Sequence, residues 1–317
     1  MPVRVAVLDD YQGIAHAFGP WDTLAPGAEV TYFHDHLLRD GVVRDLLEEF
    51  EVLVAMRERT PFTRERLASL GNLKLLVTTG MGNASIDMEA ARELGITVCG
   101  TGSLPSPTAE LAWGLIIALQ RHLPEEDRRI RDGGWQGTIG PELAGRSLGI
   151  VGLGRLGRRV ARVAQAFDMR VIAWSEHLTP ESAAEAGAEA VAFDDLLRRA
   201  DVLTIHTRLS DRTRGLIGAR ELGLMKETAI LVNTSRGPIV DEDALLAALH
   251  AGAIAGAALD VYATEPLPAD HPLRDAPRTL LSPHLGYVTT GTYEVFYGDA
   301  VEDIAAWMRG EPVRVLN

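Results

Sequence analysis

The sequence predicts an α/β protein of two domains, each with a parallel sheet covered by helices on both faces. Three observations lead to this prediction. The chain has 317 residues, more than one ordinary domain needs. Short apolar runs alternate with stretches of helical period along most of it. A segment rich in Gly, Ser and Pro, residues 100–107, separates an earlier alternating series from a later one.

The first series contains four apolar runs that are typical of buried parallel strands. They lie at residues 3–8, 52–56, 73–77 and 96–99. Stretches of helical period lie at residues 37–50, 63–70 and 86–94. This order of strand and helix predicts a flavodoxin-like domain over residues 1–100.

The second series follows a helical pattern at residues 108–123, where we place the crossing between domains. Its strands are expected at residues 147–151 and near Val171, Val202, Ile230, Ala255 and Leu280. One last helix, residues 292–308, then ends the pattern, and packing against the first domain is its most economical position. The predicted domains are residues 1–100 with 287–317, and an inserted domain of residues 101–286.

Composition and charge restrict the classes of function. A formal net charge of −13 argues against nucleic acid and anionic membranes as partners. The arginine-rich stretches at residues 128–131 and 155–162 have helical spacing and are expected to be solvated faces. A single cysteine, Cys99, argues against disulfides and cysteine metal clusters. With no signal peptide or apolar run of about 20 residues, we expect a cytoplasmic protein without a bound metal.

A glycine motif at residues 152–157 follows a predicted strand and opens a predicted helix. Gly152 permits a tight turn, Gly154 lets backbone N–H groups approach a pyrophosphate, and Gly157 allows the helix to pack closely on the strand. Arg155 and Leu156 begin the helix, whose N-terminus would hold the anion. The alternative is a glycine-rich turn without a ligand, but the context favours a Rossmann dinucleotide-binding domain.

The end of the following strand bears on the choice of dinucleotide. An acid is expected there to bind the adenosine ribose, yet Ser175 holds that position and Glu176 comes next. A carboxylate would repel a 2′-phosphate. The sequence therefore favours NAD as the cofactor and leaves NADP as the alternative.

Three polar residues follow strands of the inserted domain, at the edge where ligands collect in open α/β sheets. Arg236 could pair with a substrate carboxylate. His284 could donate a proton to a carbonyl oxygen, because histidine titrates near neutral pH. Glu265 could orient the imidazole and favour its charged form. Each residue alone could be a surface or turn residue, but together they predict an active site.

The order and spacing of these motifs resemble those of the D-isomer-specific 2-hydroxyacid dehydrogenases. The resemblance runs from residue 108 to His284 and includes residues 152–157, 233–237, 259–266 and 282–286. It implies that Arg236 binds the substrate, that His284 is the acid and base, and that Glu265 supports it. It implies that Asp260 binds the nicotinamide carboxamide. It also implies that further residues line the cofactor: Thr207, Thr234, Ser235 and Gly286.

The first domain resembles the family more loosely. Its glycine-rich loop at residues 79–87 implies that backbone N–H groups at Met81 and Gly82 receive the substrate carboxylate. The pair Ala84–Ser85 departs from the family's commoner Asp-Asn. Arg57, after a strand, is a candidate for the same pocket, with a solvated loop arginine as the alternative. The resemblance further implies a homodimer formed through the cofactor domain.

The predicted function is hydride transfer between NAD(H) and a small 2-hydroxy acid or 2-oxo acid. One alternative is a branch of the family that oxidises formate or phosphite, which the Glu265 and His284 pair argues against. The other is a non-catalytic regulator that senses NAD(H) on the same fold. Glyoxylate, hydroxypyruvate and bulkier acids remain open as substrates.

Overall fold

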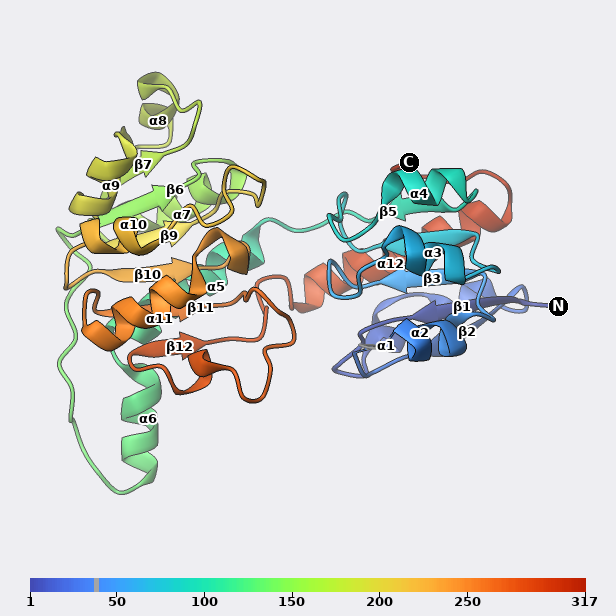
Figure 1. Cartoon of the computed structure of the whole chain (residues 1–317), viewed down its shortest axis with the longest axis horizontal. Coiled ribbons are helices and arrows are strands. Elements are labelled where there is room, and N and C mark those ends of the chain that lie inside the picture. Colours follow the sequence, from blue (N-terminus) through green and yellow to red (C-terminus); the bar gives the residue numbers. More distant parts are fainter. Residues whose placement is uncertain (37–39) are drawn as a thin grey trace. The chain divides into compact units, whose positions relative to one another are not determined.

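The computed structural model describes residues 1–36 and 40–317, and the backbone divides into two compact units (Figure 1). Unit 1 comprises Met1–Leu104 and Val288–Asn317, and unit 2 comprises Pro105–Tyr287. The sequence placed the domain boundaries after residues 100 and 286, which lie four residues and one residue before these divisions.

Unit 1 is built on a five-stranded parallel sheet in the order β2-β1-β3-β4-β5. The strands are β1 (Val3–Val7), β2 (Ala28–Tyr32), β3 (Val52–Ala55), β4 (Leu75–Thr78) and β5 (Thr97–Gly100). This is the strand order of flavodoxin-like doubly wound folds. The fold class predicted for this half is confirmed.

Strand β2 was missing from the prediction. It is an edge strand that pairs only with β1, so it needs little burial. Its residues alternate between half-buried and exposed positions, with Glu29 and Thr31 exposed. Such a strand has no continuous apolar run, which was the signal used for the other four.

Helices cover both faces of the unit 1 sheet. They are α1 (Ala15–Phe18), α2 (Asp40–Leu47), α3 (Arg64–Ser69), α4 (Met88–Glu93) and α12 (Thr290–Met308). Thr63 and Asp87 cap α3 and α4 by accepting hydrogen bonds from the amides of Arg66 and Ala90. Residues 37–39, where the predicted helix 37–50 was to begin, lie outside the described residues. Helix α12 packs on α1 and β4, which returns the end of the chain to unit 1.

Unit 2 is built on a seven-stranded parallel sheet in the order β12-β11-β10-β9-β6-β7-β8. Its strands are β6 (Ser147–Val151), β7 (Arg170–Trp174), β8 (Glu189–Ala190), β9 (Val202–Ile205), β10 (Ile230–Asn233), β11 (Gly256–Leu259) and β12 (Thr279–Leu281). The order reverses between β6 and β9, as in Rossmann folds. Ligands of such sheets bind outside the carboxyl ends of the strands at this point.

The unit 2 sheet separates two apolar cores, because successive side chains of a strand point to opposite faces. One core contains Val151, Leu203 and Leu231, and the other contains Ile150 and Val232. The helices are α5 (Ser106–Gln120), α6 (Leu123–Arg131), α7 (Arg155–Ala166), α8 (Pro180–Glu185), α9 (Phe193–Arg199), α10 (Ala219–Leu224) and α11 (Glu242–Ala251). Helix α5 packs on α7, β10 and β11, so these two helices cover the second core.

The two arginine-rich stretches lie on α6 and α7. Helix α6 buries no residue, and Arg131 pairs with Asp127 at 2.9 Å. Helix α7 buries Gly157, Val160 and Ala161, while Arg159 is exposed. Both stretches therefore have the solvated character expected of them. In the part of the chain that the structure describes, no helix has the length and apolar character to cross a membrane.

Candidate functional site

The glycine turn between β6 and α7 leaves no space for side chains at two positions. Gly152 has a φ of 100°, and a Cβ there would lie 2.6 Å from the Thr207 nitrogen. A Cβ on Gly157 would lie 2.3 Å from the Gly152 carbonyl oxygen. Glycine at both positions therefore brings the helix against the strand, as the motif suggested.

The N-terminus of α7 is open to a ligand. Among the described residues, no hydrogen bond uses the amides of Arg155, Leu156 or Gly157. Gly154 is exposed, and a Cβ there would have no atom within 4 Å. Unpaired amides at a helix N-terminus attract anions. The turn thus fits the pyrophosphate of a dinucleotide.

The loop after β7 holds the turn in place. The Ser175 hydroxyl accepts a hydrogen bond from the Leu153 amide at 2.8 Å. Ser175 therefore stabilises the glycine turn from the position where an acid was expected. Glu176 forms an ion pair with Arg212 on the loop after β9. The carboxylate of Glu176 therefore lies next to the glycine turn, on the loop that follows β7.

Arg236 lies on a loop that Asn233 organises. The Asn233 side chain accepts from the Ser235 amide at 3.0 Å and donates to the Arg236 carbonyl at 3.0 Å. Ser235 donates from its hydroxyl to the Thr207 carbonyl. A Cβ on the next residue, Gly237, would lie 2.0 Å from the Tyr262 carbonyl carbon. The loop that carries Arg236 therefore packs directly on the segment that leads to Glu265.

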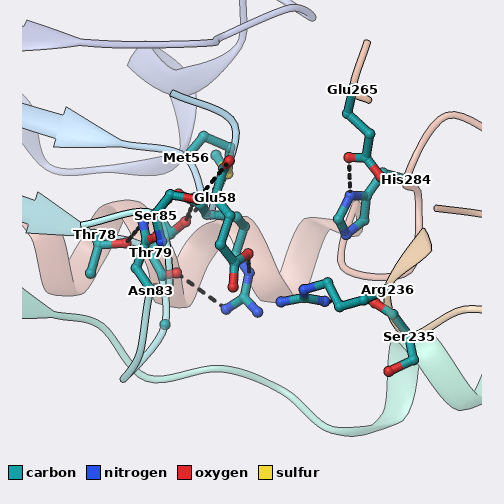
Figure 2. Close-up of polar contacts among 12 residues, drawn as sticks. Met56, Glu58, Thr78, Thr79, Asn83, Ser85, Ser235, Arg236, Glu265 and His284 are labelled. Atoms are coloured by element: carbon teal, nitrogen blue, oxygen red, sulfur yellow. Dashed lines mark hydrogen bonds and ion pairs between the residues drawn. The ribbon is translucent and has the colours of Figure 1, made fainter. Parts of the chain in front are cut away.

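Glu265 and His284 form a direct pair (Figure 2). His284 Nδ1 lies 2.6 Å from Glu265 Oε2, and Glu265 Oε1 accepts from the Tyr262 amide at 3.0 Å. The side chains are 14% and 21% exposed. Because a carboxylate only accepts, Nδ1 carries the hydrogen and Nε2 is left to exchange a proton. The guanidinium of Arg236 and the imidazole of His284 lie on the same side of these loops (Figure 2).

Asp260 holds the segment that carries His284. It is fully buried and accepts from the Ser282 hydroxyl at 2.6 Å and from the Leu285 and Gly286 amides at 2.7 and 2.9 Å. Burial raises the pKa of Asp260 above its ordinary value, against these hydrogen bonds. His284 has a φ of 55°, a strained value for a residue other than glycine. The hydrogen bonds to Asp260 hold the segment in this conformation.

Three further side chains at this edge were not found from the sequence. Ser282 supports Asp260, and the Thr108 hydroxyl donates to the Gly286 carbonyl at 2.8 Å. His206 follows β9, and its Nε2 lies 2.9 Å from Thr204 Oγ1. Burial lowers the pKa of His206 to about 4, so the ring is neutral at physiological pH. Ser282 and His206 directly follow β12 and β9, which was their only signal in the sequence, whereas Thr108 lies in the first turn of α5.

The glycine-rich loop of unit 1 is organised by Asn83 and Arg57. Asn83 donates to the Arg57 carbonyl at 2.5 Å and to Thr78 Oγ1 at 2.9 Å (Figure 2). The Arg57 guanidinium donates to the Thr79 carbonyl at 3.2 Å. A Cβ on Gly80 would lie 2.1 Å from Arg57 Nη1, so glycine makes room for the guanidinium.

The amides of Met81 and Gly82 have no hydrogen-bond partner among the described residues, and the Met81 side chain is 57% exposed. Ser85, part of the departure from the family's pattern, donates its amide to Asn83 Oδ1 at 2.8 Å. The hydrogen bonds of the Asn83 side chain therefore fix the conformation of this loop. Unit 1 presents two open amides beside a guanidinium, which suits an anion.

Comparison with known proteins decides the family. The model of the D-isomer specific 2-hydroxyacid dehydrogenase NAD binding domain matches residues 113–286, more than half of the chain. The chain belongs to this family. In 113–286, the match includes the glycine turn, Arg236, Glu265 and His284.

Named relatives agree with this. A glyoxylate reductase of Aeropyrum pernix is 43% identical over 262 residues, covering 79% of this chain and 78% of its own. A D-3-phosphoglycerate dehydrogenase of Archaeoglobus fulgidus is 37% identical, covering 87% of this chain and 53% of its own. A crystal structure of a phosphoglycerate oxidoreductase from Vibrio cholerae is 38% identical, with a TM-score of 0.92, and covers 97% of this chain and 99% of its own. Membership of the family supports oxidoreduction between 2-hydroxy acids and 2-oxo acids with NAD(H).

Proposed function

We propose that the chain interconverts a 2-oxo acid and a D-2-hydroxy acid, with His284 as the acid and base, Glu265 as its support and Arg236 as the carboxylate-binding residue. The 2.6 Å contact between His284 and Glu265 carries this proposal. It lies at the carboxyl edge of a Rossmann sheet, on the loops that follow β11 and β12, and Arg236 lies on the loop that follows the neighbouring strand β10.

The charges of the site suit reduction of a carbonyl. Nicotinamide supplies the hydride when bound. His284 Nε2 gives a proton to the carbonyl oxygen, and Glu265 stabilises the charged imidazole before this transfer. Arg236 pairs with the substrate carboxylate and polarises the adjacent carbonyl. Oxidation of the hydroxy acid uses the same groups in reverse.

The unit 1 loop is proposed to bind the substrate carboxylate as well. The resemblance assigns this role to the Met81 and Gly82 amides, with Arg57 as a candidate for the same pocket. Two observations support this role. The amides of Met81 and Gly82 lack a hydrogen-bond partner among the described residues, and the absence of a side chain at Gly80 leaves room beside them for the Arg57 guanidinium.

We propose NAD rather than NADP as the preferred cofactor. Glu176 places a carboxylate on the loop where the adenosine ribose of a Rossmann cofactor binds, and a 2′-phosphate would meet its negative charge. Arg212, the cation closest to that carboxylate, is engaged with it.

A pair of glycine substitutions separates cofactor binding from folding. Gly154→Ala should leave the melting temperature within a few degrees, because its φ is −81° and its Cβ would meet no atom within 4 Å. It should weaken NADH binding by roughly tenfold or more, because the methyl group would occupy the approach to the pyrophosphate. Gly157→Ala should destabilise the protein, because its Cβ would clash with the Gly152 carbonyl. NADH affinity is measured by fluorescence titration. Equal affinity in Gly154→Ala and wild type would contradict binding of the pyrophosphate at the glycine turn.

The proposed homodimer has a candidate surface on unit 2. Helix α6 and the segment after it project from the unit 2 sheet (Figure 1). They expose large apolar side chains, among them Ile130, Trp135 and Ile139, of which Trp135 is 73% exposed. Exposed apolar groups of this size mark interaction surfaces. We propose that a second copy of the chain covers them.

Light scattering tests this surface. Wild type should have the mass of a dimer, and Trp135→Ser combined with Ile139→Ser should shift it toward the monomer. Leu94→Ser in unit 1, where an apolar side chain is 46% exposed, is the control and should stay dimeric. A monomeric wild type, or a dimer that survives the double substitution, would refute the assignment.

A panel of 2-oxo acids distinguishes the enzyme from a regulator on the same fold. Glyoxylate, hydroxypyruvate, its phosphate ester and bulkier acids are assayed with NADH and NADPH in parallel. At least one acid should cause loss of nicotinamide absorbance, with NADH preferred. Binding of NADH without turnover of any acid would favour the regulator, and turnover with formate or phosphite alone would favour that branch of the family.

A further inference from the structure

The segment that carries Glu265 runs from the end of β11 to a short 3₁₀ helix, Pro272–Asp275. Its apolar anchors lie on either side of Glu265. Tyr262 and Leu267 both pack in one of the two apolar cores of unit 2. Between these anchors, residues 263, 264 and 266 are exposed. Apolar packing therefore does little to fix the backbone around Glu265, which leaves this task to polar contacts.

Glu242, the first residue of α11, bonds to this segment at two points. Its Oε2 accepts from the Ala263 amide at 3.0 Å, and its Oε1 lies 2.9 Å from His271 Nε2. The side chains of Glu242 and His271 are 19% and 21% exposed. His271 Nδ1 accepts from the Leu273 amide at 3.3 Å, so the tautomer that fits both contacts carries its hydrogen on Nε2 and donates it to Glu242. One carboxylate thus bridges both ends of the segment.

Two adjacent amides before Glu265 each donate to a carboxylate. The Tyr262 amide donates to Glu265 Oε1 at 3.0 Å, and the Ala263 amide donates to Glu242. Because the two donors are neighbours, a backbone rotation that released one would also move the other. The loop of Arg236 confines the same backbone, since a Cβ on Gly237 would lie 2.5 Å from the Ala263 nitrogen. Glu242 therefore holds the backbone that orients the Glu265 carboxylate.

We propose that Glu242 and His271 form a second carboxylate–imidazole pair, which positions Glu265 for its contact with His284. This inference rests on the proposed function, because it needs Glu265 to support proton transfer by His284. Loss of either contact of Glu242 frees the segment around Ala263, so the Glu265 carboxylate lies less often at the 2.6 Å distance from His284 Nδ1. Glu242 and His271 are thus positioning residues, and their loss should lower kcat while NADH binding is retained.

Single substitutions test each side of the pair. Glu242→Gln places an amide N–H group against one of two donors, and His271→Asn keeps an acceptor for the Leu273 amide but is too short to reach Glu242. We expect each to lower kcat with the best 2-oxo acid roughly three- to tenfold, the usual effect of one hydrogen bond, with NADH affinity within twofold. His271→Gln, which is long enough to donate to Glu242, should recover part of the loss. Asp243→Asn, at the next and exposed residue of α11, is the control and should change neither quantity.

A double-mutant cycle distinguishes positioning of Glu265 from a general loss of structure. Glu265→Ala removes the carboxylate that the pair positions, so adding Glu242→Gln should then lower kcat less than twofold. Melting temperatures verify that each variant is folded during the assay. Equal losses of kcat in the wild-type and Glu265→Ala backgrounds, a parallel loss of NADH affinity, or unchanged kcat in both Glu242→Gln and His271→Asn would overturn the inference. Wild-type kcat in Glu265→Ala would instead refute the proposed role of Glu265, and the inference with it.

Discussion

Replacing His284 with asparagine is expected to lower kcat roughly 10²- to 10⁴-fold, the range of general acid–base catalysis. The amide can still donate to Glu265 Oε2, so the loop should keep its geometry, but no group remains that gives a proton to the carbonyl oxygen. The affinity for NADH should stay within a few-fold. Steady-state kinetics with the best 2-oxo acid, alongside fluorescence titration of NADH, provide the measurement.

Glu265→Gln is the companion variant. It should lower kcat less than His284→Asn does, because it removes the charge that stabilises the imidazolium but leaves the proton donor in place. If His284→Asn kept a tenth or more of the wild-type kcat, the acid–base assignment would be wrong.

Replacing Arg236 with glutamine should lower kcat/KM roughly 10²- to 10⁴-fold, because two charge-assisted hydrogen bonds to the substrate carboxylate are lost. Arg236→Lys keeps the charge without the paired geometry and should recover only part of this loss. Arg170→Gln, at the exposed amino end of β7, is the matched control and should leave kcat/KM unchanged. A loss in Arg236→Gln confined to NADH affinity would show that Arg236 serves the cofactor instead.

The fold was predictable where burial leaves a continuous pattern. Strands such as β3 and β4 are buried at every residue and stand out as apolar runs. Strand β2 is half exposed and β8 has two residues, so neither produces such a run. Their existence depends on pairing with β1 and β7, which a local pattern does not contain.

The candidate site was predictable where one short segment carries the chemistry. The glycine turn and the loops of Arg236, Glu265 and His284 each follow a strand, and their order along the chain matches a known family. The role of Asp260 in holding residues 285 and 286 was not predictable, because it depends on hydrogen bonds between separate loops.

His206 shows the same limit most clearly. As one of nine histidines it carries no motif of its own, and the sequence gives no reason to connect its ring with Thr204. The connection arises from the conformation at the end of β9, which brings His206 Nε2 to 2.9 Å from Thr204 Oγ1. Ser175 is a related case, because its position suggested the adenosine ribose while its hydroxyl binds the Leu153 amide.

Transfer of deuterium tests the central claim most directly. The protein is incubated with NADH deuterated at C4 of the nicotinamide and with each acid of the panel, and the product is analysed by mass spectrometry and chiral chromatography. The account predicts that at least one 2-oxo acid yields the D-2-hydroxy acid with one deuterium on C2, and that His284→Asn yields almost none. Binding of NADH without deuterium in any hydroxy acid, or deuterium on C2 of the L-isomer, would contradict it.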